Sequence, residues 1–228
     1  MTKQSMKEYV YQTVKAAIYK QKLAPGQKLV ENEISESLSI SRTPIRQAFS
    51  KLQEEGFLTI SPNKGAHVIN PTVDEISEAF THRKQLELLA SNNIMEWITT
   101  DDIAKLKELN QLEKESYQQS DFLAYMDMNK AFHSTLIEGC NNRFLKNNTI
   151  KMINQTHIYL ALYDHFYHNI SHQKKDTRGS NEHQMLVNYL IHQDQSSFSS
   201  LLATHISTTI DEYKTRVKSF HQARDLFS

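Results

Sequence analysis

Cysteine is almost absent from this sequence of 228 residues, because Cys140 is the only one, and a disulfide within one chain is therefore excluded. A single thiol fits a reducing compartment. The sequence also lacks a run of the roughly 18 apolar residues that a membrane span needs, and its first residues contain no apolar segment typical of a secretory signal. We therefore expect a cytoplasmic protein that has no membrane partner.

Glycine and proline are scarce, at five and four residues, so long irregular segments are not expected.

The net charge is zero, but the charges are unevenly distributed along the chain. Residues 1–70 contain ten basic and six acidic side chains, whereas ten of the eleven histidines lie beyond them. A basic first part joined to an acidic, histidine-rich remainder favours nucleic acid as the partner of the first part.

The first 71 residues combine short helical patterns with strand patterns. The expected elements are a helix over 5–21, a strand over 28–30, a helix that carries Ile34 and Leu38, a third helix that Ser41 caps and Gly56 ends, and a hairpin over 57–70. Two helices, a polar turn, a third helix and a hairpin, in this order, predict a winged helix-turn-helix domain over residues 1–71.

The third helix begins with two arginines, although the helix dipole disfavours positive charge at this end. Its apolar residues Ile45, Phe49 and Leu52 are spaced to pack against the first two helices. The other face carries the predicted DNA-contacting side chains, which are Arg42, Thr43, Arg46 and Gln47. A recognition helix meets base edges and phosphates with its N-terminal residues, so DNA in front of this helix would explain the arginines. The alternative is an ordinary solvated helix face.

The tip of the hairpin supplies two further candidates for DNA contact, Lys64 and Gly65. We expect the tip to reach the groove beside the recognition helix, where Gly65 allows the backbone to approach closely.

The run LAPGQKLVENEISESLSISRTPIRQAFSKLQEEGFL, residues 23–58, resembles the DNA-binding domain of the GntR transcription regulators. The resemblance implies that a set of residues faces the operator, namely Arg42, Thr43, Arg46 and Gly65. It also implies a homodimer that binds an inverted repeat, most often as a repressor. Gln47 stands where glutamate is usual in this family, which could change the base preference, and Ser39 stands where the turn often has glycine.

From Thr72 onward the sequence contains helical patterns and no strand pattern. We expect helices over 73–98, 101–117, 121–139, 143–168, 180–192 and 196–222, with the polar run QKKDTRGS at 173–180 as the clearest loop. The predicted fold class is therefore mainly α, with the winged helix-turn-helix followed by an all-helical bundle of about six or seven helices over residues 72–228. A bundle of this size can enclose a ligand cavity between its helices.

Three of these helices carry a histidine on an apolar face, and the histidines are His133, His183 and His205. Asn129 lies one turn before His133 on the same face. Imidazoles that converge in one core repel one another when protonated. A divalent cation resolves this repulsion, because neutral imidazole is a common ligand of zinc, nickel and copper. The alternative is that each histidine is an ordinary packed core residue.

Residues 72–228 also resemble the FCD effector domain of FadR-like GntR regulators, through RKQLE at 83–87, MNKAFHSTL at 128–136 and the late histidines. The resemblance implies a zinc or nickel site made by Asn129, His133, His183 and His205. Metal-binding domains of this type have an aspartate at the first of these positions, whereas asparagine supplies a carbonyl oxygen without charge. We therefore expect weaker cation binding, or binding by the three histidines with water or ligand, and we expect Asn129→Asp to tighten it.

Arg83 is expected to meet an anionic ligand, because the resembled domain has an arginine at this point that reaches into the cavity, and a guanidinium suits a carboxylate. The alternative is a surface arginine that pairs with Glu87 one turn later. His157 and Tyr163 would line the same cavity, or would simply be packing residues.

The leading hypothesis is a DNA-binding transcriptional regulator that a small carboxylate effector controls. The rival hypothesis is a metal-dependent hydrolase that uses the three histidines. The sequence contains no glycine-rich phosphate loop, no nucleophile motif and no dinucleotide fingerprint, and a DNA-binding domain has no role on a hydrolase. We therefore predict that the chain is not an enzyme.

Overall fold

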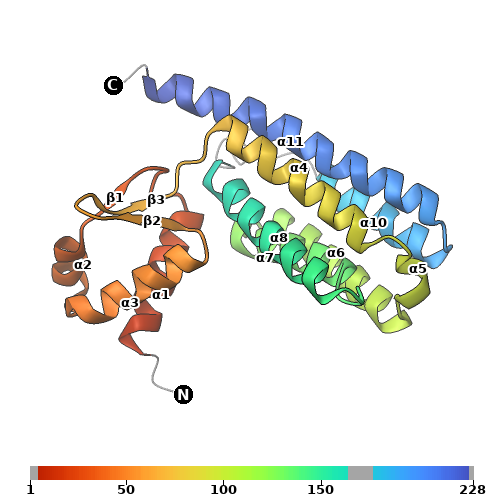
Figure 1. The fold of residues 1–228 in the computed structure, drawn as a ribbon, viewed down its shortest axis with the longest axis horizontal. Coiled ribbons are helices and arrows are strands. Elements are labelled where there is room, and N and C mark those ends of the chain that lie inside the picture. The colour runs from red at the N-terminus through yellow and green to blue at the C-terminus, as the bar shows by residue number, and fades with distance from the viewer. Residues whose placement is uncertain (1–4, 164–176, 226–228) are drawn as a thin grey trace. The chain divides into compact units, whose positions relative to one another are not determined.

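The computed structural model describes residues 5–163 and 177–225. The chain divides into two compact units, of which unit 1 covers residues 1–71 and unit 2 covers residues 72–228 (Figure 1). In the two described ranges, no helix has the combination of length and apolar character that crossing a membrane requires.

Unit 1 combines three helices with a small antiparallel sheet (Figure 1). The helices are α1 (Met6–Tyr19), α2 (Glu31–Leu38) and α3 (Arg42–Glu54), and the strands are β1 (Lys28–Leu29), β2 (Leu58–Ser61) and β3 (Gly65–Val68). The strand order is β1-β3-β2, so the hairpin strands pair with each other and β1 adds to the other edge of β3. The predicted winged helix-turn-helix is confirmed.

The core of unit 1 lies between α1 and α3. Ile45, Phe49 and Leu52 on α3 are at most 2% exposed, so the predicted inward face is confirmed. Ser41 is the N-cap residue of α3, as predicted, and has the extended backbone of that position, although its side chain makes no capping hydrogen bond. Gly56 follows Glu55, the C-cap residue of α3, and has a φ of 86°, which is the left-handed backbone expected of a glycine just past the end of a helix.

Within the described residues, unit 2 contains six long helices and a short one. These are α4 (Val73–Ala90), α5 (Ile94–Trp97), α6 (Thr100–Gln118), α7 (Phe122–Leu136), α8 (Arg143–Tyr163), α10 (Arg178–Ile191) and α11 (Gln195–Asp225). The long helices pack in the cyclic order α4, α8, α7, α6, α10, α11, and α11 packs back against α4, with which it lies side by side in Figure 1. The helical bundle predicted after Thr72 is therefore confirmed, and its helices enclose a common interior.

The single helix expected over 73–98 is wrong, because the chain leaves the helix at Ser91 and resumes at Ile94 as α5. Asn93 has a left-handed backbone with φ of 59°, which asparagine tolerates better than most residues. The sequence contains no glycine or proline at this break, so the signal for it was weak.

The expected loop at 173–180 ends earlier than its polar composition suggests. The Thr177 side chain accepts a hydrogen bond from the Ser180 backbone amide and thereby caps α10. Residues 164–168, which were expected to end the preceding helix, lie outside the described ranges.

Candidate metal centre and nucleic-acid interface

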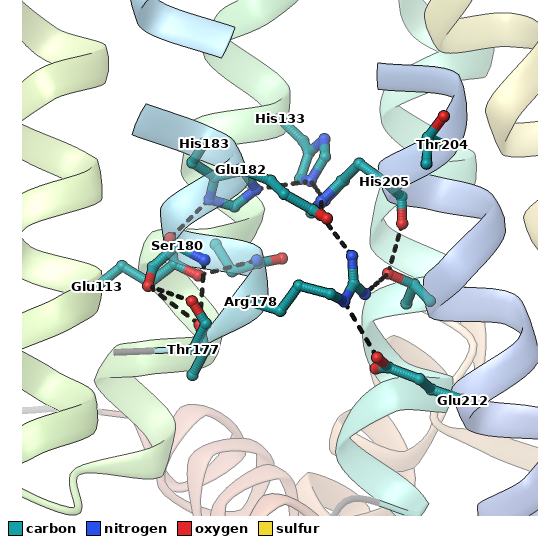
Figure 2. A network of polar contacts seen from close by, with 12 residues as sticks. Glu113, His133, Thr177, Arg178, Ser180, Glu182, His183, Thr204, His205 and Glu212 are labelled. Atoms are coloured by element: carbon teal, nitrogen blue, oxygen red, sulfur yellow. Dashed lines mark hydrogen bonds and ion pairs between the residues drawn. The ribbon is translucent and has the colours of Figure 1, made fainter. Parts of the chain in front are cut away.

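Three histidines from three helices of unit 2 meet in its interior. His133 comes from α7, His183 from α10 and His205 from α11, and all three are buried. The Nε2 atom of His133 lies 3.4 Å from that of His183 and 3.3 Å from that of His205. Figure 2 shows the three rings pointing toward one another. The convergence expected from the sequence is therefore present, and the group could hold a metal ion.

A glutamate contacts the outer nitrogen of each ring. The Nδ1 atoms donate to carboxylate oxygens in three pairs, which are His133 to Glu87 at 2.8 Å, His183 to Glu113 at 2.7 Å and His205 to Glu182 at 2.7 Å. The carboxylates come from α4, α6 and α10. A carboxylate behind an imidazole is typical of metal-binding histidines, because it orients the ring and fixes the tautomer.

These contacts determine which ring nitrogen carries the proton. An ionised carboxylate only accepts hydrogen bonds, so the proton is assigned to each Nδ1, and a neutral ring in this tautomer directs its Nε2 lone pair at the centre. Burial lowers the pKa of His133 and of His205 and outweighs the opposing effect of their glutamates. Burial alone would raise the pKa of Glu87, but the charge of Arg83 and the hydrogen bonds from His133 and Arg83 lower that pKa below its usual value.

The spacing of the Nε2 atoms suits a cation. Two nitrogens bound to zinc at about 2.0–2.1 Å and separated by a tetrahedral angle lie about 3.3–3.4 Å apart. The two separations measured from His133 Nε2, 3.4 and 3.3 Å, fall in this range. Lone pairs directed at one point repel one another unless a cation or a proton lies between them, and burial opposes the proton. The three histidines therefore fit a divalent metal.

Asn129, the fourth predicted ligand, contacts one of the glutamates. Its Nδ2 donates to Glu113 Oε1 at 3.1 Å, while Glu113 Oε2 accepts from His183. Coordination of a metal by Asn129 stays a prediction.

None of the three glutamates was predicted from the sequence as a histidine partner. Glu87 was considered only as a partner of Arg83. Glu182 directly precedes His183 in the sequence, but the ring that it bonds is that of His205. Glu113 lies in a helix of mixed polarity, with no sequence signal that distinguishes it from its exposed acidic neighbours.

Arg83 is only 4% exposed, so the alternative of a surface arginine is wrong. Its guanidinium donates to Glu87, as that alternative expected, and also to Thr156 Oγ1 on α8 at 3.1 Å. Glu87 in turn accepts from His133, so a continuous hydrogen-bonded chain leads from Arg83 to the histidine cluster.

The other two predicted ligand-binding residues, His157 and Tyr163, are buried on α8. Both lie in the same unit as the histidine cluster. Their contact with a ligand stays a prediction, as does that of Arg83.

A second arginine, Arg178, extends the network on the side of α11 (Figure 2). It donates to Glu182, which is the carboxylate behind His205, and to Glu212 Oε1 at 3.1 Å. Burial alone would raise the pKa of Glu182, but the hydrogen bonds from His205 and Arg178 lower it. Arg178 therefore contributes to lowering the pKa of this carboxylate, and no such role of Arg178 was predicted from the sequence.

The side chains of α3 that were predicted to contact DNA are exposed in unit 1; they are Arg42, Thr43, Arg46 and Gln47. Arg46 Nε donates to Glu31 Oε2 of α2 at 2.8 Å, while 65% of the Arg46 side chain remains exposed. An acidic neighbour thus orients this guanidinium without covering it.

The hairpin tip is also exposed, including Lys64 and Gly65. The backbone amide of Lys64 donates to the carbonyl of Ser61 at 3.2 Å and closes the turn. Asn63 and Gly65 have φ of 65° and 85°, a conformation that glycine adopts without strain.

Both units match known protein families. Residues 6–68 match the gntR family of bacterial regulatory proteins, and residues 78–208 match the FCD domain. The uncharacterised HTH-type transcriptional regulator YdhC of Bacillus subtilis is 28% identical over 138 residues, which are 60% of this chain and 62% of YdhC. The HTH-type transcriptional repressor RspR of Escherichia coli is 24% identical over 135 residues, which are 59% of each protein.

The fold is shared with a solved structure, that of McbR/YncC from E. coli, with a TM-score of 0.72 at 22% identity over 93% of this chain and 99% of that one. The similarity to YdhC and RspR spans about three fifths of the length of those relatives. The FCD match alone covers more than half of the present sequence. The chain therefore belongs to the gntR family of bacterial regulatory proteins and carries an FCD domain in its C-terminal unit.

Proposed function

We propose that this protein is a DNA-binding transcriptional repressor whose unit 2 responds to a small carboxylate through a bound divalent metal. Membership of a family of regulatory proteins supports the first part of the proposal. The exposed arginines at the start of α3 support it independently, because recognition helices present their N-terminal residues to DNA. The single observation that carries the second part is the meeting of three Nε2 atoms inside unit 2.

In this proposal a homodimer binds an inverted repeat, in keeping with the twofold symmetry of helix-turn-helix proteins and their operators. Each α3 would enter a major groove with Arg42 and Arg46 facing base edges or phosphates. Lys64 and Gly65 at the hairpin tip would follow the adjacent groove.

Zinc and nickel are the metals that fit best, because both accept neutral imidazole nitrogens. His133, His183 and His205 would hold the ion through Nε2. Three protein ligands leave coordination positions for a carboxylate, and the metal when bound supplies the positive charge that attracts it. Arg83 and Tyr163 are the residues of this unit that we propose as further contacts of the carboxylate, together with His157.

The proposed route from the metal to the DNA-binding unit is α4. This helix begins at Val73, directly after unit 1 ends, and it carries Glu87, which bonds both Arg83 and His133. A change in the coordination of His133 would change its hydrogen bond to Glu87. Because Glu87 belongs to α4, the change would reach the position of that helix. Effector binding would in this way change the spacing of the two DNA-binding units in the dimer.

A metal-dependent hydrolase is the rival function, and two findings weigh against it. The family is one of regulatory proteins. In addition, Glu87, Glu113 and Glu182 each bond a ring Nδ1, which is the nitrogen away from the Nε2 atoms where a metal-bound water would lie, so none of these three is placed to act on that water as a general base.

Selection from random duplex DNA by the purified full-length chain tests the DNA-binding part. The expected result is enrichment of one inverted repeat. Enrichment of no sequence, or of an unsymmetrical half-site bound by a monomer, would contradict it.

The metal-dependent part is tested on the selected DNA. Its affinity for the protein is measured by fluorescence anisotropy with and without lactate or malate. A carboxylate should change that affinity in zinc-loaded protein and leave it unchanged in chelator-treated protein. An equal response in both would contradict the metal-dependent part.

A further inference from the structure

We infer that Asn129 is a positioning residue that holds Glu113 against His183, and that an aspartate at this position weakens the metal site. The inference rests on the proposed metal centre. It reverses the expectation from the sequence, in which the missing charge of Asn129 is the weakness of the site and Asn129→Asp repairs it.

The three histidines share one pattern, in which a donor bonds a glutamate and the glutamate bonds a ring. The three sets are Arg83–Glu87–His133, Arg178–Glu182–His205 and Asn129–Glu113–His183. Arginine is the donor in the first two sets, and the Asn129 amide occupies the corresponding place in the third. The side chain of Asn129 thus does for Glu113 what a guanidinium does for the other two carboxylates.

Both carboxylate oxygens of Glu113 accept a hydrogen bond. Oε1 accepts from Asn129 Nδ2 at 3.1 Å, and Oε2 accepts from His183 Nδ1 at 2.7 Å. Glu113 is fully buried on α6, and the two donors reach it from α7 and α10. A buried carboxylate needs such donors, because without them its desolvation is not compensated.

Glu113 in turn orients the ring of His183. His183 stacks on Phe132 with ring centroids 4.1 Å apart, which restricts the tilt of the ring but leaves the choice between its two nitrogens open. The bond to Glu113 makes this choice, because it keeps the proton on Nδ1 and the lone pair of Nε2 at the centre. Asn129 therefore acts on the metal through Glu113 and His183.

An ionised aspartate at position 129 has no proton to donate. It would lose the bond to Glu113 and place a second carboxylate, at a half-buried position, against the fully buried carboxylate of Glu113, and the two like charges would repel. Glu113 would then move away from His183 or bind a proton, and either change removes the support of the ring. Loss of such outer partners typically weakens metal binding about 10–100-fold.

The test uses Asn129→Asp, Glu113→Gln and the double variant, with Asn147→Asp as a control that adds the same charge at an exposed position of α8. The double variant reverses the polarity of the bond, since the new amide donates to the new carboxylate and its carbonyl still accepts from His183. Zinc affinity is measured by competition with a chromophoric chelator. We expect Asn129→Asp to raise the Kd for zinc about 10–100-fold, the control to leave it unchanged, and the double variant to recover most of the loss.

Thermal unfolding in excess chelator supplies a readout that does not depend on metal. Asn129→Asp should lower the melting temperature and the added Glu113→Gln should raise it again, even if the single variant folds poorly. If Asn129→Asp binds zinc more tightly than the wild type, with either glutamate or glutamine at position 113, the positioning role of Asn129 is wrong. That result would still support the proposed metal centre. A double variant no better than the single one would also overturn that role. A wild-type protein that binds no zinc would overturn the metal centre itself and the inference with it.

Discussion

Glu87 Oε2 and His133 Nδ1 lie 2.8 Å apart, although 46 residues separate the two side chains in the sequence. The bond crosses the interior of unit 2, because α4 and α7 are not neighbours in the ring of helices and α8 lies between them in the packing order. The same carboxylate accepts from Arg83. One buried side chain therefore links the proposed metal ligand to the helix that leads toward unit 1.

Replacing Glu87 by glutamine should weaken zinc binding about 10–100-fold, as expected for the loss of an outer partner of a metal-binding imidazole. An amide has one acceptor oxygen for two donors, so it leaves either Arg83 or His133 without its bond. Calorimetric titration of zinc into chelator-treated protein measures the effect. Glu78→Gln on the exposed side of the same helix is the matched control and should behave as the wild type. Equal zinc affinities in the two variants would contradict the role of Glu87.

Removing the guanidinium by Arg83→Met should lower the free energy of unfolding of unit 2 by about 3–5 kcal/mol, because it leaves Glu87 buried without its cationic partner. The single tryptophan, Trp97, lies in α5, so its fluorescence during urea unfolding reports on this unit. Arg143→Met removes an exposed arginine of α8 and should change the free energy by less than about 0.5 kcal/mol. A small loss for Arg83→Met would show that water or another group replaces the guanidinium.

Replacing Arg46 by alanine should cost about 1–3 kcal/mol of binding to the selected operator and relax the preference at one base pair, if this side chain reads a guanine. If Arg46 holds only a phosphate, the loss of affinity should be the same on specific and scrambled DNA. The slope of log affinity against log salt concentration should then become less steep by about one. Anisotropy titrations on both DNAs at several salt concentrations separate the two cases. Unchanged affinity on both DNAs would remove Arg46 from the interface.

Two glycines of unit 2 should respond in opposite ways to substitution by alanine. A Cβ at Gly139 would lie 2.1 Å from a ring carbon of Trp97, so Gly139→Ala must displace that indole and should destabilise the unit. A Cβ at Gly179 would meet its nearest atoms at 3.8 Å, and alanine there should stabilise α10 by up to about 1 kcal/mol. Urea unfolding of the two variants in chelator gives the comparison. A tolerated Gly139→Ala would mean that the indole has room to move.

Unit 1 could be predicted from the sequence in nearly all its elements, because its signals are local. Gly56 ends α3, the glycine at 65 permits the tight hairpin, and Ile45, Phe49 and Leu52 define the buried face of α3 without reference to distant residues.

In unit 2, the break between α4 and α5 was not predicted, because asparagine at 93 gives a much weaker signal for a break than glycine would.

The histidine cluster could be predicted because each histidine shares a helix face with apolar residues. The glutamates behind the rings could not, because the partners of His183 and His133 are 70 and 46 residues away and meet only when the ring of helices closes. A sequence pattern contains the spacing within a helix but not the packing order of six helices. The hydrogen bond between Asn129 and Glu113 could not be predicted for the same reason. The missing charge of Asn129 was therefore interpreted as a weakness of the metal site.

The proposed function depends on a divalent metal that His133, His183 and His205 hold through Nε2. Its most direct test is calorimetric titration of zinc, and separately nickel, into chelator-treated wild type and His183→Ala, with Asn188→Ala on the exposed side of α10 as the control. We expect the wild type and the control to bind one ion per chain and His183→Ala to lose that binding. Identical titrations for wild type and His183→Ala, or no binding by the wild type, would contradict it.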